Sequence, residues 1–244
     1  MNKTAMQTVT IRISNYDVYE NGRAKLSSLM KYMQQLARDD CDSYGATYGA
    51  LRNDNMVFVI TNLAIEFYDD LYDGDIIELS TCNNAIRGVI FERRFIATRN
   101  GDLIFSAVTD WVLMDFTARK VLRPSAMRFP IVEEHKMDSP LTTKRRIPSP
   151  ESGIETEHIV RYTELDENRH LNNTVYADIL IDNLATDVPD KRIETCFLNF
   201  NGEACLGDSL SVISNYSDGI YRSAATNTKN MKSCYAAELK FYGD

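Results

Sequence analysis

No apolar run in the sequence approaches the roughly 20 residues that a transmembrane helix needs, and we expect no membrane partner. The N-terminal residues 1–6 also lack the apolar core of a signal peptide and lead directly into strand-like sequence. We therefore expect a cytoplasmic protein. Its 44% hydrophobic and 25% charged residues are typical of a globular chain with a buried core.

Cysteine and histidine are too few and too scattered to predict a disulfide framework or a metal site. The five cysteines are odd in number and form no C-x-x-C pair, so we expect reduced thiols, several of them in the core. The three histidines show no H-x-x-x-H spacing, which argues against zinc. The sequence therefore implies no metal and no cofactor. The positions are Cys41, Cys82, Cys196, Cys205 and Cys234, with His135, His158 and His170.

Positive charge is also scarce, because 27 Lys and Arg face 35 Asp and Glu and leave a net charge of -8. This balance argues against nucleic acid or an anionic membrane as a partner. It also provides no overall attraction to an acidic carrier protein. The compact basic groups lie at 93–94 and 144–146, and we interpret both as solvated surface charge.

The same order of predicted elements occurs twice along the 244 residues. An alternating strand precedes a helix in each half, and four strand-like runs follow. In the first half, the helix carries one apolar stripe, and Asn100-Gly101 predicts a hairpin. The expected strands are 7–15, 56–69, 75–86, 88–99, 103–115, 156–164, 192–203, 208–216, 219–227 and 231–242, with helices at 24–44 and 171–186.

Segment 128–155 carries four of the six prolines amid mixed charge and predicts a linker between domains 1–127 and 156–244. A helix followed by antiparallel strands, in tandem, indicates an α+β fold in which each sheet wraps its helix. The two sheets can join edge to edge, which protects otherwise exposed strand edges. An apolar tunnel between helix and sheet, lined by the buried stripe of 24–44, would then accommodate an extended alkyl chain.

Residue matches between the halves support a duplication. Segment 19–24 falls on 165–170 at an offset of 146, and 67–75 falls on 200–208 at an offset of 133. The change of 13 residues fits a shorter connection after the second helix. This alignment places Glu20, Gly22 and Ala24 opposite Asp166, Asn168 and His170. Because the first copy then lacks the amide and the imidazole, we expect one active site, in the C-terminal half.

The segment 165–173 carries the strongest chemical signal. Asp166, Asn168 and His170 alternate, so in an extended chain their side chains share one side. The helix that follows offers free backbone N–H groups, at about His170–Asn172, as donors to an oxyanion. These groups together fit acyl transfer to water. The alternative interpretation is a polar helix cap without catalytic function.

The chain resembles the acyl-ACP thioesterase family, the plant and bacterial enzymes with a tandem hotdog fold, along nearly its whole length. The blocks that carry this resemblance are 36–37 with Gly45, 56–60, 74–75, 93–95, 109–115, 117–120, 123–124, 165–176, and Glu203 with 207–208. The resemblance implies an acyl-binding, non-catalytic N-terminal hotdog at 1–127 and a catalytic C-terminal hotdog at 156–244.

The resemblance implies hydrolysis of fatty acyl thioesters on acyl carrier protein, which releases free fatty acid and terminates fatty acid synthesis. It implies Asp166, Asn168, His170 and Glu203 as the catalytic set. Either Glu203 or Asp166 orients the imidazole or activates the water, and covalent attack by a carboxylate is an alternative. The implied partner is an acyl carrier protein bearing a phosphopantetheine-linked chain, and a homodimer is left open.

Three positions depart from the family pattern. Phe58 and Cys82 stand where members often carry Trp, which leaves the preferred chain length open. Ala204 stands where some plant members have Cys. Because Cys205 lies one residue further along a strand, its side chain should face the opposite side, and we interpret it as a structural thiol.

Three other functions compete with this hypothesis. An acyl-CoA thioesterase would act on the same phosphopantetheine arm. A hotdog dehydratase of 3-hydroxyacyl thioesters also pairs His with a carboxylate, although the D-x-N-x-H order and Glu203 argue against it. A non-catalytic acyl-thioester sensor is the alternative from another class, and the sequence contains no separate DNA-binding segment to support it.

Overall fold

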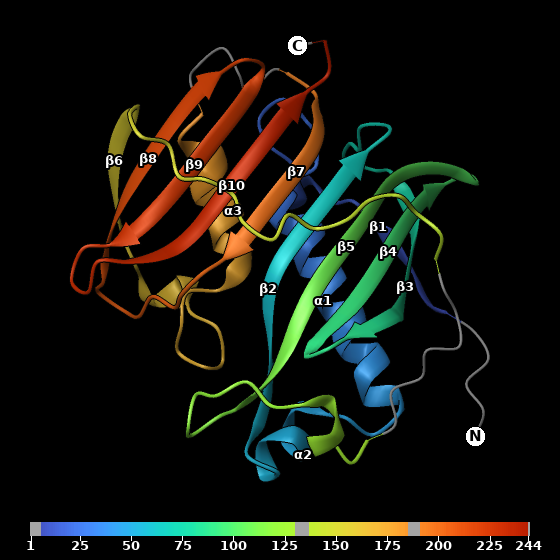
Figure 1. Cartoon of the computed structure of the whole chain (residues 1–244). Coiled ribbons are helices and arrows are strands. Elements are labelled where there is room, and N and C mark those ends of the chain that lie inside the picture. The colour runs from blue at the N-terminus through green and yellow to red at the C-terminus, as the bar shows by residue number, and fades with distance from the viewer. Residues whose placement is uncertain (1–5, 130–136, 185–190, 244) are drawn as a thin grey trace.

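A single antiparallel sheet of ten strands runs through both halves of the chain (Figure 1). The computed structural model describes residues 6–129, 137–184 and 191–243, and within them the strand order is β1-β3-β4-β5-β2-β7-β10-β9-β8-β6. Strands β2 and β7 join the halves through pairs from Asn62 with Asn199 to Glu66 with Thr195. The predicted edge-to-edge joining of the two sheets is therefore confirmed.

Each predicted strand and both predicted long helices are present. The first half contains β1 Gln7–Arg12, α1 Leu26–Ser43, α2 Tyr48–Asn53, β2 Met56–Phe67, β3 Ile76–Arg87, β4 Ile90–Arg99 and β5 Asp102–Asp115. The second half contains β6 Ile154–Ile159, α3 Asn173–Asp182, β7 Ile193–Phe200, β8 Ser209–Ser217, β9 Ile220–Asn227 and β10 Lys232–Phe241. The short helix α2 was not predicted, and residues 185–186 of the predicted second helix lie outside the described residues.

Both long helices cover the same face of the sheet (Figure 1). The predicted stripe of α1 is buried there, since its six side chains are at most 6% exposed. Each Leu or Met of this stripe contributes about 1.5–3 kcal/mol when its side chain is removed from water, so packing rather than helix propensity holds α1 in place. The stripe consists of Leu26, Leu29, Met30, Met33, Leu36 and Ala37.

The connection between the halves crosses the other face of the sheet as a packed strap (Figure 1). Leu141 packs against Ala64 and Val108, and the backbone N–H of Ile147 donates to Asn199 Oδ1 at 2.7 Å. The described part of the predicted linker is thus attached to the sheet by both apolar and polar contacts. Residues 130–136 of that linker, which include His135, lie outside the described residues.

The basic pair at 93–94 is buried, so its interpretation as solvated surface charge was wrong. Arg93 is 3% exposed and pairs with Asp40 at 2.9 Å, and Arg94 is 7% exposed and pairs with Glu92 at 2.9 Å. Buried charges are tolerated only when they are paired and hydrogen-bonded.

No helix in the described part of the chain is long and apolar enough to cross a membrane.

A repeated hydrogen-bond pattern confirms that the halves correspond but corrects one offset. The bridge between Val18 and Ala24 matches that between Leu165 and Leu171, which sets the first offset at 147 rather than 146. The backbone bond from Ala24 N to Leu71 O matches that from Leu171 N to Ala204 O, which keeps the second offset at 133.

Under this alignment, Tyr19, Asn21 and Arg23 stand opposite Asp166, Asn168 and His170. The earlier placement of Glu20, Gly22 and Ala24 was therefore wrong by one residue, and the first copy does keep an amide. The offsets differ by 14 residues rather than 13. The first half therefore has 14 more residues than the second between the two matched segments. These extra residues lengthen its helix, since α1 has 18 residues and α3 has 10, and they form α2.

Candidate active site

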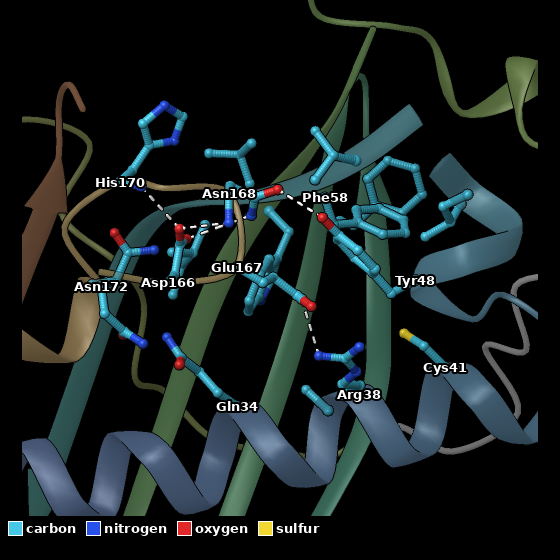
Figure 2. A pocket seen from close by; sticks show the side chains of 18 of the residues that line it. Gln34, Arg38, Cys41, Tyr48, Phe58, Asp166, Glu167, Asn168, His170 and Asn172 are labelled. Atoms are coloured by element: carbon cyan, nitrogen blue, oxygen red, sulfur yellow. Dashed lines mark hydrogen bonds and ion pairs between the residues drawn. The ribbon is translucent and has the colours of Figure 1, made fainter. Parts of the chain in front are cut away.

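Asp166 shapes a tight turn in the backbone that carries the other candidate residues (Figure 2). Its Oδ1 atom accepts the backbone N–H groups of Asn168 at 2.8 Å and His170 at 3.0 Å. Arg169 has a φ of 65°, in the left-handed region, and Asp166 N donates to His170 O at 2.8 Å. The segment is therefore a closed turn, and the predicted extended conformation was wrong.

Asn168 is fixed between Asp166 and a tyrosine from the first half of the chain (Figure 2). Its Oδ1 atom accepts from the Tyr48 hydroxyl at 2.9 Å, and its Nδ2 atom lies 3.4 Å from Asp166 Oδ2. Because a carboxylate can only accept, the amide nitrogen must face Asp166 and the amide oxygen must face Tyr48. One amide hydrogen of Asn168 is left to donate to a ligand.

Tyr48 lies at the start of α2, which the sequence interpretation missed. The signal for this helix is Thr47, whose side chain accepts from Ala50 N at 3.1 Å as an N-cap. The helix spans only six residues and contains Gly49, so it is too short to show an apolar period.

His170 and Glu203 face each other across the bridge between the turn and the loop that follows β7. Nε2 of His170 lies 3.4 Å from Oε2 of Glu203, and the other carboxylate oxygen pairs with Arg119. The pKa of His170 lies below its ordinary value of 6.5, mainly because burial disfavours the charged imidazolium. The negative charge of Asp166 opposes this shift, and the positive charge of Arg119 adds to it. The imidazole is therefore mainly neutral at pH 7.

All four predicted site residues line one cavity of about 620 Å³ between the halves. The turn and the loop after β7 supply these residues, whereas α1, α2 and β2 supply the opposite walls. Of the predicted α1 stripe, only Ala37 reaches the cavity, so the expectation that the stripe lines it was wrong. The walls combine polar and apolar groups, among them Gln34, Arg38, Cys41, Tyr48, Leu51, Phe58, Phe91 and Trp111.

The predicted oxyanion donors are already occupied by protein acceptors. The N–H of His170 donates to Asp166, that of Leu171 to Ala204 O at 2.8 Å, and that of Asn172 to Glu164 O at 2.9 Å. Helix α3 begins one residue later, with Asn172 as its N-cap. The N–H of Asn173 is one of those that a helix leaves without an internal acceptor, and this residue lines the cavity.

Cys205 is exposed, whereas its neighbour Ala204 is fully buried at 0% exposure. The opposite orientation that was predicted for consecutive residues is thus observed. Cys205 is not among the described residues that line the cavity. Within the described ranges, no three His, Cys, Asp or Glu side chains cluster as metal ligands would.

The first copy of the repeat places an ion pair where the second has His170 and Glu203. Arg23 corresponds to His170, Asp70 corresponds to Glu203, and Arg23 Nε lies 3.3 Å from Asp70 Oδ2. An arginine stays protonated in proteins and cannot accept a proton from water. Of the two copies as the structure describes them, the second is therefore the one that places a proton acceptor opposite this carboxylate.

Two family models match the chain in succession. The model of the acyl-ACP thioesterase N-terminal domain matches residues 3–126, and that of the C-terminal domain matches residues 148–240. Oleoyl-acyl carrier protein thioesterase 1 of Arabidopsis thaliana is 22% identical over 89% of this chain and 66% of its own length. An acyl-[acyl-carrier-protein] hydrolase of Cuphea viscosissima is 23% identical over 76% of this chain and 48% of its own length.

The chain thus spans about half to two thirds of the length of these relatives. Solved structures match it over almost its full length. An acyl-ACP thioesterase from Bacteroides thetaiotaomicron has a TM-score of 0.88 at 20% identity, covering 97% of both chains. The 12:0-ACP thioesterase from Umbellularia californica has a TM-score of 0.83 at 16% identity, covering 97% of this chain and 96% of that one. The predicted tandem hotdog fold is confirmed.

Proposed function

The chain belongs to the acyl-ACP thioesterase family, and we propose that it hydrolyses fatty acyl thioesters on acyl carrier protein, releasing the free fatty acid and so terminating fatty acid synthesis. The observation that carries this proposal is the contact of His170 with Glu203 at the wall of a cavity of about 620 Å³. The cavity offers room for an acyl chain beside an acid–base pair.

In the proposed reaction, the neutral imidazole of His170 takes a proton from water as the water attacks the thioester carbonyl. A carboxylate facing Nε2 favours the proton on that nitrogen, which leaves the lone pair of Nδ1 to act as the base. Glu203 is then the carboxylate that orients the imidazole. Asp166 supports catalysis by holding the turn, because its contacts are with backbone N–H groups and Asn168.

The negative charge that develops on the carbonyl oxygen needs donors at the cavity wall. The free amide hydrogen of Asn168 and the N–H of Asn173 are the donors that we propose. Each donor of this kind contributes about 2.7–4 kcal/mol to the transition state in known oxyanion holes. The electropositive end of α3 adds to this effect.

The lowered pKa of His170 predicts where activity is lost in acid. The base must be neutral, so kcat/KM falls as the pH drops through the pKa of the free enzyme. Because burial holds this pKa below 6.5, we expect kcat/KM to be near its plateau at pH 7 and half-maximal below pH 6.5. Thiol release from an acyl carrier substrate, measured between pH 4.5 and 8, gives the profile; a half-maximal point above 6.5 would contradict the assignment.

Replacing Cys205 by alanine should leave kcat within about twofold of the wild-type value, because Cys205 is exposed and does not line the described cavity. Initial rates on one acyl substrate check this result. A folded but inactive Cys205→Ala variant would restore the thiol as a candidate nucleophile.

A panel of acyl carriers tests the proposed function directly. The purified protein is given acyl chains of varied length on acyl carrier protein and on CoA, and free thiol and free fatty acid are both quantified. We expect equal amounts of both products and a higher kcat/KM on acyl carrier protein. A higher kcat/KM on CoA would favour the acyl-CoA thioesterase, an unsaturated thioester product the dehydratase, and tight binding without release the sensor.

A further inference from the structure

Side chains from the first half reach across the cavity to the turn and the loop of the second half that carry the residues proposed for catalysis. Tyr48 donates to Asn168, and Arg38 pairs with Glu167 at 3.0 Å. Arg119, from the turn that follows β5, pairs with Glu203. Of these three side chains, Arg119 is the one that contacts the His170–Glu203 pair itself.

The turn that carries Arg119 is held by its own hydrogen bonds. Asp115 Oδ1 accepts from Ala118 N at 2.6 Å and from Asn55 Nδ2 at 2.8 Å, and Asp115 O accepts from Arg119 N at 2.9 Å. Arg119 itself has a φ of 56°, in the left-handed region that residues with a Cβ rarely adopt. From this turn the guanidinium reaches the loop after β7, where it pairs with Glu203.

The ion pair lies at the surface, where it contributes little to folding. The side chains of Arg119 and Glu203 are 40% and 39% exposed, and exposed pairs contribute about 0–1 kcal/mol to stability. The backbone of Glu203 is fixed without Arg119, because the Tyr176 hydroxyl donates to Gly202 O at 3.4 Å and Leu171 N donates to Ala204 O at 2.8 Å. Arg119 therefore fixes the orientation of the Glu203 carboxylate and does not determine the backbone conformation of the loop.

We propose that Arg119 is a positioning residue: it holds Oε1 of Glu203 so that Oε2 faces the imidazole of His170. This inference rests on the proposed function, because it assigns a role in the same reaction. A carboxylate with one free oxygen rotates, whereas one held by a guanidinium keeps its second oxygen in place. Arg119 thereby makes a side chain of the first half part of the catalytic arrangement of the second.

The first copy of the repeat shows the same arrangement with a different partner. Asp70, the counterpart of Glu203, lies between Arg23 and an arginine from the opposite half, with Arg192 Nε 3.8 Å from Asp70 Oδ1. Arg192 is 30% exposed, comparable to Arg119, and it does not line the cavity within the described residues. It is therefore a matched control for the loss of an arginine at a carboxylate.

Three charged groups act on the His170 imidazole from the elements around it. Asp166 belongs to its own turn, Glu203 to the loop after β7, and Arg119 to the turn after β5. Cys205, opposite His170 in the bridge, is a further titratable neighbour. The positive charge of Arg119 lowers the pKa of His170, so removing this charge raises that pKa.

The test compares Arg119→Gln, Arg119→Lys and Arg192→Gln with the wild type. In Arg119→Gln we expect kcat to fall about tenfold, part of the 10²–10⁴ that acid–base catalysis supplies, with KM within about twofold. In the same variant, the fall of kcat/KM on the acid side of the pH profile should move to higher pH. Arg119→Lys should restore the position of this fall, and Arg192→Gln should match the wild type. A wild-type profile in Arg119→Gln, or the same loss in Arg192→Gln, would overturn the proposal.

A substrate-free measurement separates this inference from the proposed function. The chain contains three histidines, and the imidazole signals of His170 in an NMR titration are identified by their absence from His170→Gln. The titration midpoint of His170 should rise in Arg119→Gln and not in Arg192→Gln. If the wild type hydrolyses no acyl thioester, the proposed function fails, and the midpoint still decides whether Arg119 acts on the pair. An unchanged midpoint in Arg119→Gln would reject the inference.

Discussion

Replacing His170 by glutamine should lower kcat by a factor of about 10² to 10⁴, the contribution of a positioned general base. Glutamine has a similar size but no nitrogen that accepts a proton near neutral pH. The His170 side chain is 24% exposed, so the variant should remain folded. Thiol release at substrate saturation measures the loss, and thermal unfolding provides the control. A folded variant with a near-wild-type rate would reject His170 as the base.

The same assay on Glu203→Gln shows whether the two residues act as one unit. If Glu203 works by orienting the imidazole, the double variant should be no slower than His170→Gln alone. Additive losses would instead indicate that Glu203 acts on the water independently of His170.

Replacing Asp166 by alanine should lower kcat by about two orders of magnitude. The change removes the acceptor of two backbone N–H groups, at 2.8 Å and 3.0 Å, and the partner of the Asn168 amide. The turn then loses the geometry that aims Asn168 and His170 into the cavity. Steady-state rates measure the effect, and circular dichroism checks the fold.

Asp166→Asn is the matched control because it keeps an oxygen at Oδ1 while it removes the charge. If Asp166 serves to hold the turn, this variant should retain kcat within about tenfold of the wild type. An Asp166→Asn variant as slow as Asp166→Ala would show that the carboxylate itself takes part in the chemistry. Wild-type rates in both variants would show that Asp166 does not contribute to catalysis.

Local periodicity predicted most of the fold. The α1 stripe from Leu26 to Ala37 has the spacing of a helix with one buried face, and the structure buries it. Asn100 and Gly101 form the predicted hairpin with φ values of 55° and 90°. These features depend on residues close in sequence, which a single chain displays directly.

Segment 166–170 does not itself reveal the conformation of its turn. This conformation depends on Arg169 in the left-handed region, where glycine is the usual signal. The repeat did contain that signal, because Gly22, the counterpart of Arg169, has a φ of 80°. The correct offset of 147 also aligns Glu20 with Glu167 and Asn21 with Asn168, identities that the offset of 146 missed.

The contacts that complete the site depend on distant parts of the chain. Tyr48 and Asn168 are 120 residues apart, and Arg119 and Glu203 are 84 apart. No local pattern predicts which turn of one half will face which loop of the other. The pairing of β2 with β7 decides this, because it fixes how the halves lie against each other.

A single turnover in oxygen-18 water tests whether water held at the His170–Glu203 pair attacks the acyl thioester directly. The enzyme is mixed in excess over an acyl-acyl carrier protein, and the fatty acid and the Glu203 peptide are analysed by mass spectrometry. We predict one oxygen-18 atom in each fatty acid released and none in Glu203. Unlabelled fatty acid, or oxygen-18 in Glu203, would contradict it.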